Sequence, residues 1–297
     1  MYNFCFVILH YNVLQDTIEC VDSIIKIARD KKIEIVVVDN NSPNKSGREL
    51  KTIYKEYKNV HIIVNAENLG FAKGNNIGYD FAKNQLKADF VAIINNDTMM
   101  IDEYFVDKIM TLFLEEEFHI MGPDIITKNG EHQNPYKEKA VSLEEVEKFL
   151  KNYKMIKKIS KVKIMIKRIL FKSKFLINLI KSIKKDKNKI FDYKISYHNV
   201  VLHGSAIVYS PLYIKNEKYA FHPDTFMYVE EDILYHLCLM KNYIIKYNPI
   251  TKIYHKEDSA TDSLLNSDEK KQEFILENHK TSYKVLRDLL KNSKNEG

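Results

Sequence analysis

The feature that most restricts the fold is an alternation of short apolar runs and helically spaced stretches over the first 135 residues. Each apolar run is rich in β-branched residues and ends in polar ones; the runs are FCFVILHYN, KIEIVVVDNNS, NVHIIVNAEN and ADFVAIINNDT. Between them, apolar side chains recur three and four positions apart in residues 16–30, 46–58 and 71–87. Strands that alternate with helices form parallel sheets covered on both faces. The pattern therefore predicts an α/β fold.

Polar side chains stand where these predicted strands end: Asn12, Asp39, Asn65 and Asp97. The carboxyl ends of parallel strands meet along one edge of a sheet, and ligands of such sheets bind there. We therefore expect several of these side chains to line one crevice.

The second half of the chain follows another pattern. Residues 145–187 are Lys-rich and helically spaced, which predicts an inserted pair of amphipathic helices broken around residues 172–174. β pattern returns at KISYHNVVLHGSAIVYS, and VEEDILYHLCLMKN begins a helix with acidic residues. Two short strands, YIIKYNP and TKIYHK, then lead to a C-terminal helix over residues 268–292.

Charge is distributed unevenly along the chain. Residues 148–189 hold fifteen Lys, one Arg and a single acid, so they carry +15 and leave −9 on the remainder of a chain whose total is +6. This contrast predicts a local anionic partner. An aliphatic stripe favours an anionic membrane surface over nucleic acid, which calls for a stacking platform; it contains Ile159, Val162, Ile166, Ile169 and Ile180. The alternative is a solvated helix face packed on the body.

The composition indicates the cellular compartment in which the protein works. Three cysteines without a CxxC pair suit a reducing environment and disfavour a disulfide framework. The N-terminal residues lack a basic leader and a cleavage site, and no apolar run approaches the roughly 20 residues that span a bilayer. We therefore expect a cytoplasmic protein.

Two strand-ending aspartates each have two interpretations. Asp39 either caps the next helix, alone or through Ser42, or accepts a hydrogen bond from a ribose hydroxyl or a base N–H. Asp97 either forms a turn or holds Mg²⁺ or Mn²⁺ on a diphosphate, which requires only one or two protein carboxylates.

The acidic cluster after Val229 and the histidine at position 255 also have two interpretations each. Glu230, Glu231 and Asp232 either complement a helix dipole or supply a carboxylate that takes a proton from a hydroxyl nucleophile. His255, in TKIYHKEDSAT, is either an ordinary polar residue after a strand or a ligand that completes a metal site.

The order of these motifs is more specific than any one of them. Asp39 is followed by NLGFAKGNNIG (68–78), INNDT (94–98), HGSAIV (203–208), FMYVEEDIL (226–234) and HKEDS (255–259). The set resembles the family 2 glycosyltransferases, in particular their rhamnosyltransferase-like bacterial branch, over about residues 1–135 and 196–260. It implies the Rossmann-like GT-A fold with a mixed, mostly parallel sheet, to which the periodicity adds a basic helical insertion and a C-terminal helix.

The resemblance implies a role for each matching residue. Asp39 would bind the base or ribose near Tyr11 and Asn12, and the Asn-x-Gly loop beside the nucleotide would be Asn68 and Gly70. Gly204 and Ser205 fall where the donor sugar or acceptor approaches. Further donor-binding residues would be Asn96, Asp97 and Glu230.

The metal ligands implied by the resemblance are Asp97 and His255, with Mg²⁺ or Mn²⁺ as cofactor. Asp97 matches the last carboxylate of the family's Asp-x-Asp motif, whose first position is here Asn95, a weaker ligand. Counting forward from Phe226-x-Tyr228 puts Glu231 at the family's catalytic aspartate, with Asp232 as the alternative base.

The implied activity is inverting transfer of a sugar from a UDP- or dTDP-linked donor, rhamnose among the candidates, to a glycan or lipid-linked acceptor in bacterial surface polysaccharide synthesis. The chain then divides into the nucleotide-sugar half, the basic insertion, the acceptor half and the C-terminal helix: residues 1–135, 136–195, 196–260 and 261–297. The expected location is the inner face of the plasma membrane. The alternatives are a sugar-nucleotide pyrophosphorylase, disfavoured because residues 1–30 contain no glycine, and a non-enzymatic membrane tether.

Overall fold

The computed structural model describes residues 2–28, 32–170, 191–257 and 268–295. For residues 161–170 it describes the backbone course and not the side chains. The predicted second helix of the insertion therefore lies outside the described part of the chain, and of the aliphatic stripe only the side chain of Ile159 is described.

The sheet is parallel at one side and mixed at the other. Four parallel strands stand in the spatial order β3-β2-β1-β4, and their bounds are Val60–Val64, Ile33–Asp39, Phe4–His10 and Phe90–Asn95. Antiparallel β8 (Ala206–Tyr209) follows β4. The order then continues with β6 (Ile120–Thr127), β9 (Ile245–His255) and β5 (Thr98–Met100), and β7 (Tyr197–His198) pairs with β9. The predicted α/β fold is confirmed.

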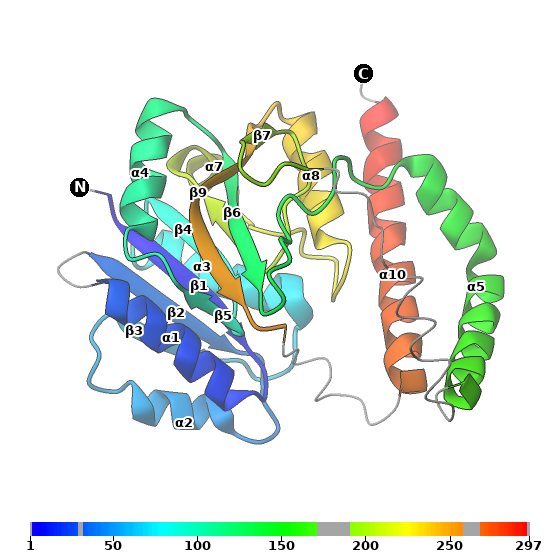
Figure 1. The fold of residues 1–297 in the computed structure, drawn as a ribbon, viewed down its shortest axis with the longest axis horizontal. Coiled ribbons are helices and arrows are strands. Elements are labelled where there is room, and N and C mark those ends of the chain that lie inside the picture. Colours follow the sequence, from blue (N-terminus) through cyan, green and yellow to red (C-terminus); the bar gives the residue numbers. More distant parts are fainter. Residues whose placement is uncertain (1, 29–31, 171–190, 258–267, 296–297) are drawn as a thin grey trace.

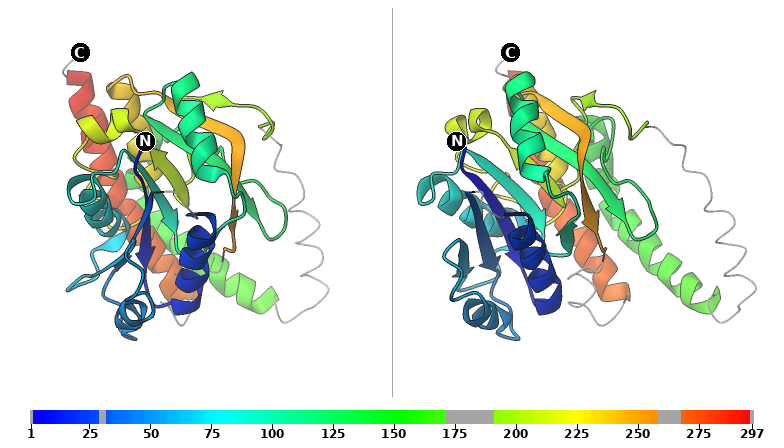
Figure 2. Two further views of the ribbon diagram at one scale, coloured as in Figure 1. Left: turned by 90° about the vertical axis from the view of Figure 1, so that its left-hand side faces the viewer. Right: turned by 60° about the vertical axis from the view of Figure 1, so that its left-hand side comes forward.

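Helices cover both faces because successive strand residues point to opposite sides. One core joins Phe4, Phe6 and Ile8 to helices α1 (Leu14–Ala28), α2 (Ser46–Ile53) and α4 (Phe105–Glu115). The other joins Cys5 and Val7 to helices α3 (Gly70–Asn84), α7 (Pro211–Asn216) and α8 (Glu230–Met240). Figure 1 shows α1 in front of the sheet and α2 below it, and Figure 2 turns the same arrangement.

Helix α5 (Leu143–Leu170) lies beside α10 (Asp268–Asn295), antiparallel to it, at one end of the sheet (Figure 1). An apolar cluster joins both helices to α8; it contains Val146, Val229, Ile233, Leu286 and Leu290. The ammonium of Lys157 adds ion pairs with Glu273 and Glu277 of α10, at 2.7 and 2.8 Å. One face of this part of the insertion is therefore packed, whereas Ile159 is 45% exposed.

One predicted boundary is wrong. YIIKYNP and TKIYHK form the single strand β9, not two strands. Pairing with β6 shifts register between Gly122 and Asp124, so residues 248–251 bulge out of the ladder. Pro249 lies in this bulge, where its missing N–H interrupts no ladder hydrogen bond. Among the described residues, no helix is long and apolar enough to cross a membrane.

Candidate active site

A cavity of about 470 Å³ opens at the carboxyl ends of β1 and β4, beside the starts of α3 and α8. Most of the residues that the sequence nominated line it: Tyr11, Asn68, Gly70, Asn96, Asp97, Glu230, Glu231 and Asp232. Of the four strand-end side chains expected to line one crevice, only Asp97 lines this cavity, so that expectation is wrong for Asn12, Asp39 and Asn65.

The loop at one end of the cavity is held by Asn40, which sequence reasoning did not single out. Its amide nitrogen donates to Asn68 Oδ1 at 2.9 Å and to the carbonyl of Gly70 at 3.0 Å, and its oxygen accepts the N–H of Leu69 at 3.0 Å. Gly70 has φ +76°, and a Cβ there would collide with the carbonyl oxygen of Phe226. Glycine at this position therefore permits both the turn and the close approach. The signal for Asn40 was its place directly after Asp39.

Asp39 and Asn12 lie beside the cavity, and neither is among its lining residues. Asp39 is 2% exposed and accepts hydrogen bonds from the hydroxyl and the backbone N–H of Ser42. The hydroxyl oxygen of Ser42 in turn accepts the N–H of Asn12 at 2.8 Å. Asp39 thus forms a turn with Ser42 but does not cap α2, whose N-cap is Lys45 without a side-chain cap hydrogen bond. The nucleotide contacts of Asp39 and Asn12 stay predictions. The buried Oδ1 of Asn12 has no partner among the described residues.

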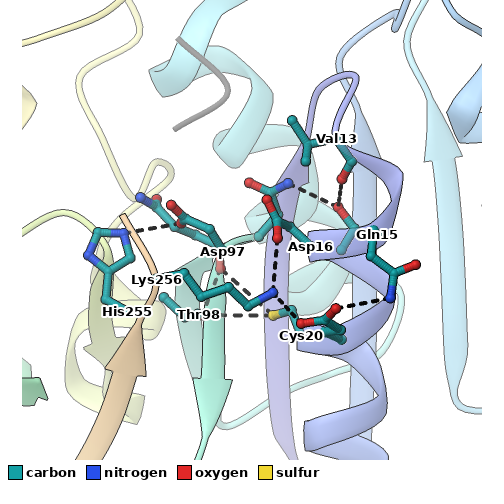
Figure 3. A network of polar contacts seen from close by, with 12 residues as sticks. Val13, Gln15, Asp16, Cys20, Asp97, Thr98, His255 and Lys256 are labelled. Carbon is teal, nitrogen blue, oxygen red and sulfur yellow. Dashed lines mark hydrogen bonds and ion pairs between the residues drawn. The ribbon is translucent and has the colours of Figure 1, made fainter. Parts of the chain in front are cut away.

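Asp97 lines the cavity, and His255, which is buried and not among the lining residues, faces Asp97 with Nε2 3.1 Å from its Oδ1 (Figure 3). Gln133 orients the ring: its Nε2 donates to Glu257 at 2.7 Å, so its Oε1 accepts from Nδ1 of His255 at 2.6 Å. In a neutral ring, a proton on Nδ1 leaves the lone pair of Nε2 directed at Asp97. Such a hydrogen bond to the second ring nitrogen is typical of metal-binding histidines.

This donor set fits a divalent cation bound jointly with a diphosphate. One carboxylate and one imidazole leave several positions to phosphate oxygens and water, as Mg²⁺ and Mn²⁺ sites on phosphate substrates do. Over the described ranges, no group of three or more His, Cys, Asp or Glu side chains forms a complete cage. The residues present therefore suit a substrate-borne metal and not an all-protein site.

Lys256 anchors this centre to α1. Its backbone N–H donates to the carbonyl of Asp97 at 2.9 Å, and its ammonium reaches Asp16 at 2.9 Å and Glu19 at 2.5 Å (Figure 3). The end of β9 and the loop after β4, which are far apart in sequence, are thereby held together.

The acidic cluster begins α8, and its three carboxylates have different partners. Tyr228 and Val229 precede it with φ of 69° and 73°, a region that is unfavourable for a β-branched residue. Asp232 accepts two hydrogen bonds from the ammonium of Lys137, at 2.7 and 2.9 Å, and one from the N–H of Val141 at 2.8 Å. It is therefore committed to holding the segment before α5.

Glu231 accepts fewer and longer hydrogen bonds than Asp232, and it lines the cavity. The N–H of Gly204 donates to its Oε1 at 3.3 Å. Burial raises the pKa of Glu231 above 4.5. Burial, and then the charge of Glu231, raise the pKa of Glu230 to about 8, and Oε1 of Glu230 is buried without a partner among the described residues. A carboxylate that lacks strong partners and has a raised pKa suits proton transfer.

The model of the family described as Glycosyl transferase family 2 matches residues 5–175, more than half of the chain. The chain belongs to glycosyl transferase family 2. The family prediction is thereby confirmed, and the rhamnosyltransferase-like branch stays a prediction.

Individual relatives of this family 2 member are distant. The low-salt glycan biosynthesis hexosyltransferase Agl10 of Haloferax volcanii is 28% identical over 97 residues, which are 33% of this chain and 30% of that protein. Among solved structures, TarS 1–349 of S. aureus in complex with UDP-GlcNAc is 16% identical with a TM-score of 0.52, over 87% of this chain and 59% of that one. GalNAc-T7 with UDP, GalNAc and Mn²⁺ is 13% identical with a TM-score of 0.55, over 86% and 44%. The chain thus spans less than two thirds of each, and the solved structures show the GT-A fold.

Gly204 and Ser205, which were predicted to lie near the sugar, lie next to residues of the family 2 site. A Cβ on Gly204 would lie 2.7 Å from Oε1 of Glu231, so glycine makes room for that carboxylate. The hydroxyl of Ser205 is 2.8 Å from Nδ1 of His203. The backbone carbonyl of Ser205 accepts the N–H of Asn95 at 3.0 Å. Neither lines the cavity, so their direct contact with a sugar stays a prediction.

Proposed function

We propose that this family 2 protein transfers a sugar from a UDP- or dTDP-linked donor to a hydroxyl of a glycan or lipid-linked glycan, with inversion. The single observation that carries the proposal is one cavity that contains both Asp97, paired with His255, and the weakly engaged Glu231. The UDP complexes of its structural relatives support a nucleotide-sugar donor, and the resemblance of INNDT to a metal–diphosphate motif agrees with them.

In this mechanism, Asp97 and His255 would hold Mg²⁺ or Mn²⁺ against the diphosphate of the donor. When bound, the metal offsets the negative charge of the leaving group. Glu231 takes the proton of the acceptor hydroxyl as its oxygen attacks the anomeric carbon from the face opposite the diphosphate. The bond from that carbon to the diphosphate oxygen breaks with its electron pair, so the anomeric configuration inverts. No covalent enzyme intermediate is formed.

The direct test is incubation with a panel of UDP- and dTDP-sugars and measurement of the released products. Transfer, or slow hydrolysis of the donor, releases nucleoside diphosphate. Release of pyrophosphate instead would favour the pyrophosphorylase alternative. No turnover and no binding of any donor would contradict the proposal.

The hydrogen bond from His255 to Gln133 predicts that Gln133→Leu weakens metal binding. The leucine removes the acceptor of the Nδ1 proton, so the ring loses its fixed orientation; losing such a partner typically costs about 10- to 100-fold in metal affinity. Calorimetric titration of Mn²⁺ in the presence of UDP measures this effect without turnover. The control is Gln85→Leu at an exposed position after α3. Equal Mn²⁺ affinity in both variants would show that Gln133 does not position the ligand.

We also propose that the basic insertion binds an anionic membrane surface. Its described part packs one face on α10, while Lys151, Lys154 and Lys158 are exposed. Lysines near an anionic surface contribute on the order of 1 kcal/mol each, and this attraction decays within roughly 8 Å at physiological salt. Attachment of this kind would bring the cavity to a lipid-linked acceptor.

Liposome flotation tests the membrane proposal. The protein is expected to float with vesicles that contain phosphatidylglycerol and to float less at high salt. Charge reversal of the three exposed lysines to Glu should weaken binding by on the order of 10²-fold. Lys157 is left unchanged because it pairs with α10. The matched control reverses three exposed lysines of the α2 region: Lys51, Lys55 and Lys58. If the unaltered protein ignores these vesicles, the insertion serves packing or self-association instead.

A further inference from the structure

Aromatic side chains line the same cavity as Glu231, and two of them come from α10, outside the residues that the family model matches. They are Tyr136, from the segment before α5, Tyr228, from the turn before α8, and His279 and Tyr283, from α10. Tyr228 belongs to the FMYVEEDIL motif, and the sequence motifs included none of the other three. Tyr228, His279 and Tyr283 lie beyond the matched region, whereas Tyr136 lies within it.

The residues of α10 and the turn form a continuous aromatic group. The rings of Tyr228 and His279 stack at 4.9 Å with an angle of 17°, and Tyr283 meets His279 edge-on at 5.9 Å. Nδ1 of His279 lies 2.8 Å from the carbonyl oxygen of Ile275 and donates to it. In a neutral ring, Nε2 is then a hydrogen-bond acceptor.

Only some of these rings take part in the packing of α10: Tyr228 and Tyr283 are partly buried against an apolar cluster. Leu286 and Leu290 are buried in the cluster shared with α5 and α8. His279 and Tyr283, one turn apart, remain half-buried and reach the cavity. Tyr136 is 48% exposed and rests edge-on against His203 at 5.3 Å. Packing on that cluster therefore accounts in part for Tyr228 and Tyr283, but not for Tyr136, which lies outside it.

We propose that this aromatic group is the acceptor subsite and that it binds a pyranose ring of the acceptor glycan. The inference rests on the proposed function, in which Glu231 must touch the acceptor hydroxyl, so that the acceptor must lie next to Glu231. Aromatic rings offer a flat apolar face to the C–H face of a sugar, and Tyr and His carry polar edges for its hydroxyls. The cluster thus selects a glycan in place of a small polar nucleophile.

Saturation-transfer NMR with irradiation of aromatic protons tests this contact. The probes are the methyl α-pyranosides of glucose, galactose, mannose, rhamnose and N-acetylglucosamine, added with UDP and Mn²⁺. At least one probe should receive saturation at its C–H protons. Tyr136→Ala and His279→Ala should weaken its binding by roughly 2- to 10-fold, the range expected for one aromatic contact. Tyr104→Ala, at a 54% exposed tyrosine before α4, should leave it unchanged.

Titration of UDP or dTDP into each variant distinguishes a failure of the acceptor-subsite proposal from a failure of the proposed function. Normal nucleotide binding with no sugar signal, or with a signal equal in all variants, would overturn the acceptor subsite alone. Failure of the unaltered protein to bind either nucleotide would instead count against the proposed function.

Discussion

Replacing Glu231 with Gln is expected to reduce sugar transfer by about 10²- to 10⁴-fold, the usual contribution of a positioned acid–base group. Glutamine has nearly the same shape and can still accept the N–H of Gly204, so the fold and the donor site should persist. It cannot take the proton of the acceptor hydroxyl. The measurements are the transfer rate with a competent donor–acceptor pair, and donor affinity by calorimetry, which should stay unchanged.

Asp232→Asn provides the contrast. Asp232 accepts from Lys137 and from the N–H of Val141, so removing its charge should lower the melting temperature more than the chemical rate. If Asp232→Asn abolishes transfer with donor binding intact while Glu231→Gln stays active, the assignment of the base is off by one residue. The structure-based expectation would then be wrong, because it assigns the proton to the less engaged carboxylate.

The pH dependence of kcat/KM tests the role of Glu231 independently. A general base works only when deprotonated, and burial raises the pKa of Glu231 above 4.5. Activity should therefore fall as the pH drops through this raised pKa, so the acid limb of kcat/KM should lie above pH 4.5. In Glu231→Gln, that limb should be missing from the residual activity.

Asp97→Asn is the second change with a large expected effect. The substitution replaces one of the two groups that face the expected metal position with a neutral, weaker ligand of the same shape, and so removes one formal charge. A metal at a diphosphate supplies several kcal/mol of charge stabilisation, so transfer should fall on the order of 10²-fold or more. Donor affinity should also lose its dependence on Mg²⁺ or Mn²⁺.

Calorimetric titration of UDP with Mn²⁺ and with chelator measures this dependence directly. Asp80→Asn, at an exposed position of α3, serves as the matched control and should behave as the unaltered protein. If the unaltered protein binds UDP equally with metal and with chelator, and Asp97→Asn changes nothing, the site does not use a metal. Glu231 would remain testable as the base, because its role does not depend on that result.

Local sequence patterns predicted much of the nucleotide half. β-branched runs that end in Asp39 and Asp97 became β2 and β4, since strand preference and burial agree there. The order of the motifs identified the family correctly. By contrast, the motifs did not single out α4 or β6, and β9 was divided at Pro249 because a bulge cannot be distinguished from a strand end by composition.

By itself, the sequence determined which residue types stand at strand ends and at the start of α8, because these depend on local periodicity. The tertiary structure decided which of them act together. It joined Asp97 to His255, 158 positions later, and assigned Asp232 to Lys137 while leaving Glu231 lightly held. It also brought His279 and Tyr283 of α10 to the cavity. Such long-range contacts arise from packing between elements and are encoded in no local pattern, which is why the contribution of α10 to the cavity emerged only from the folded chain.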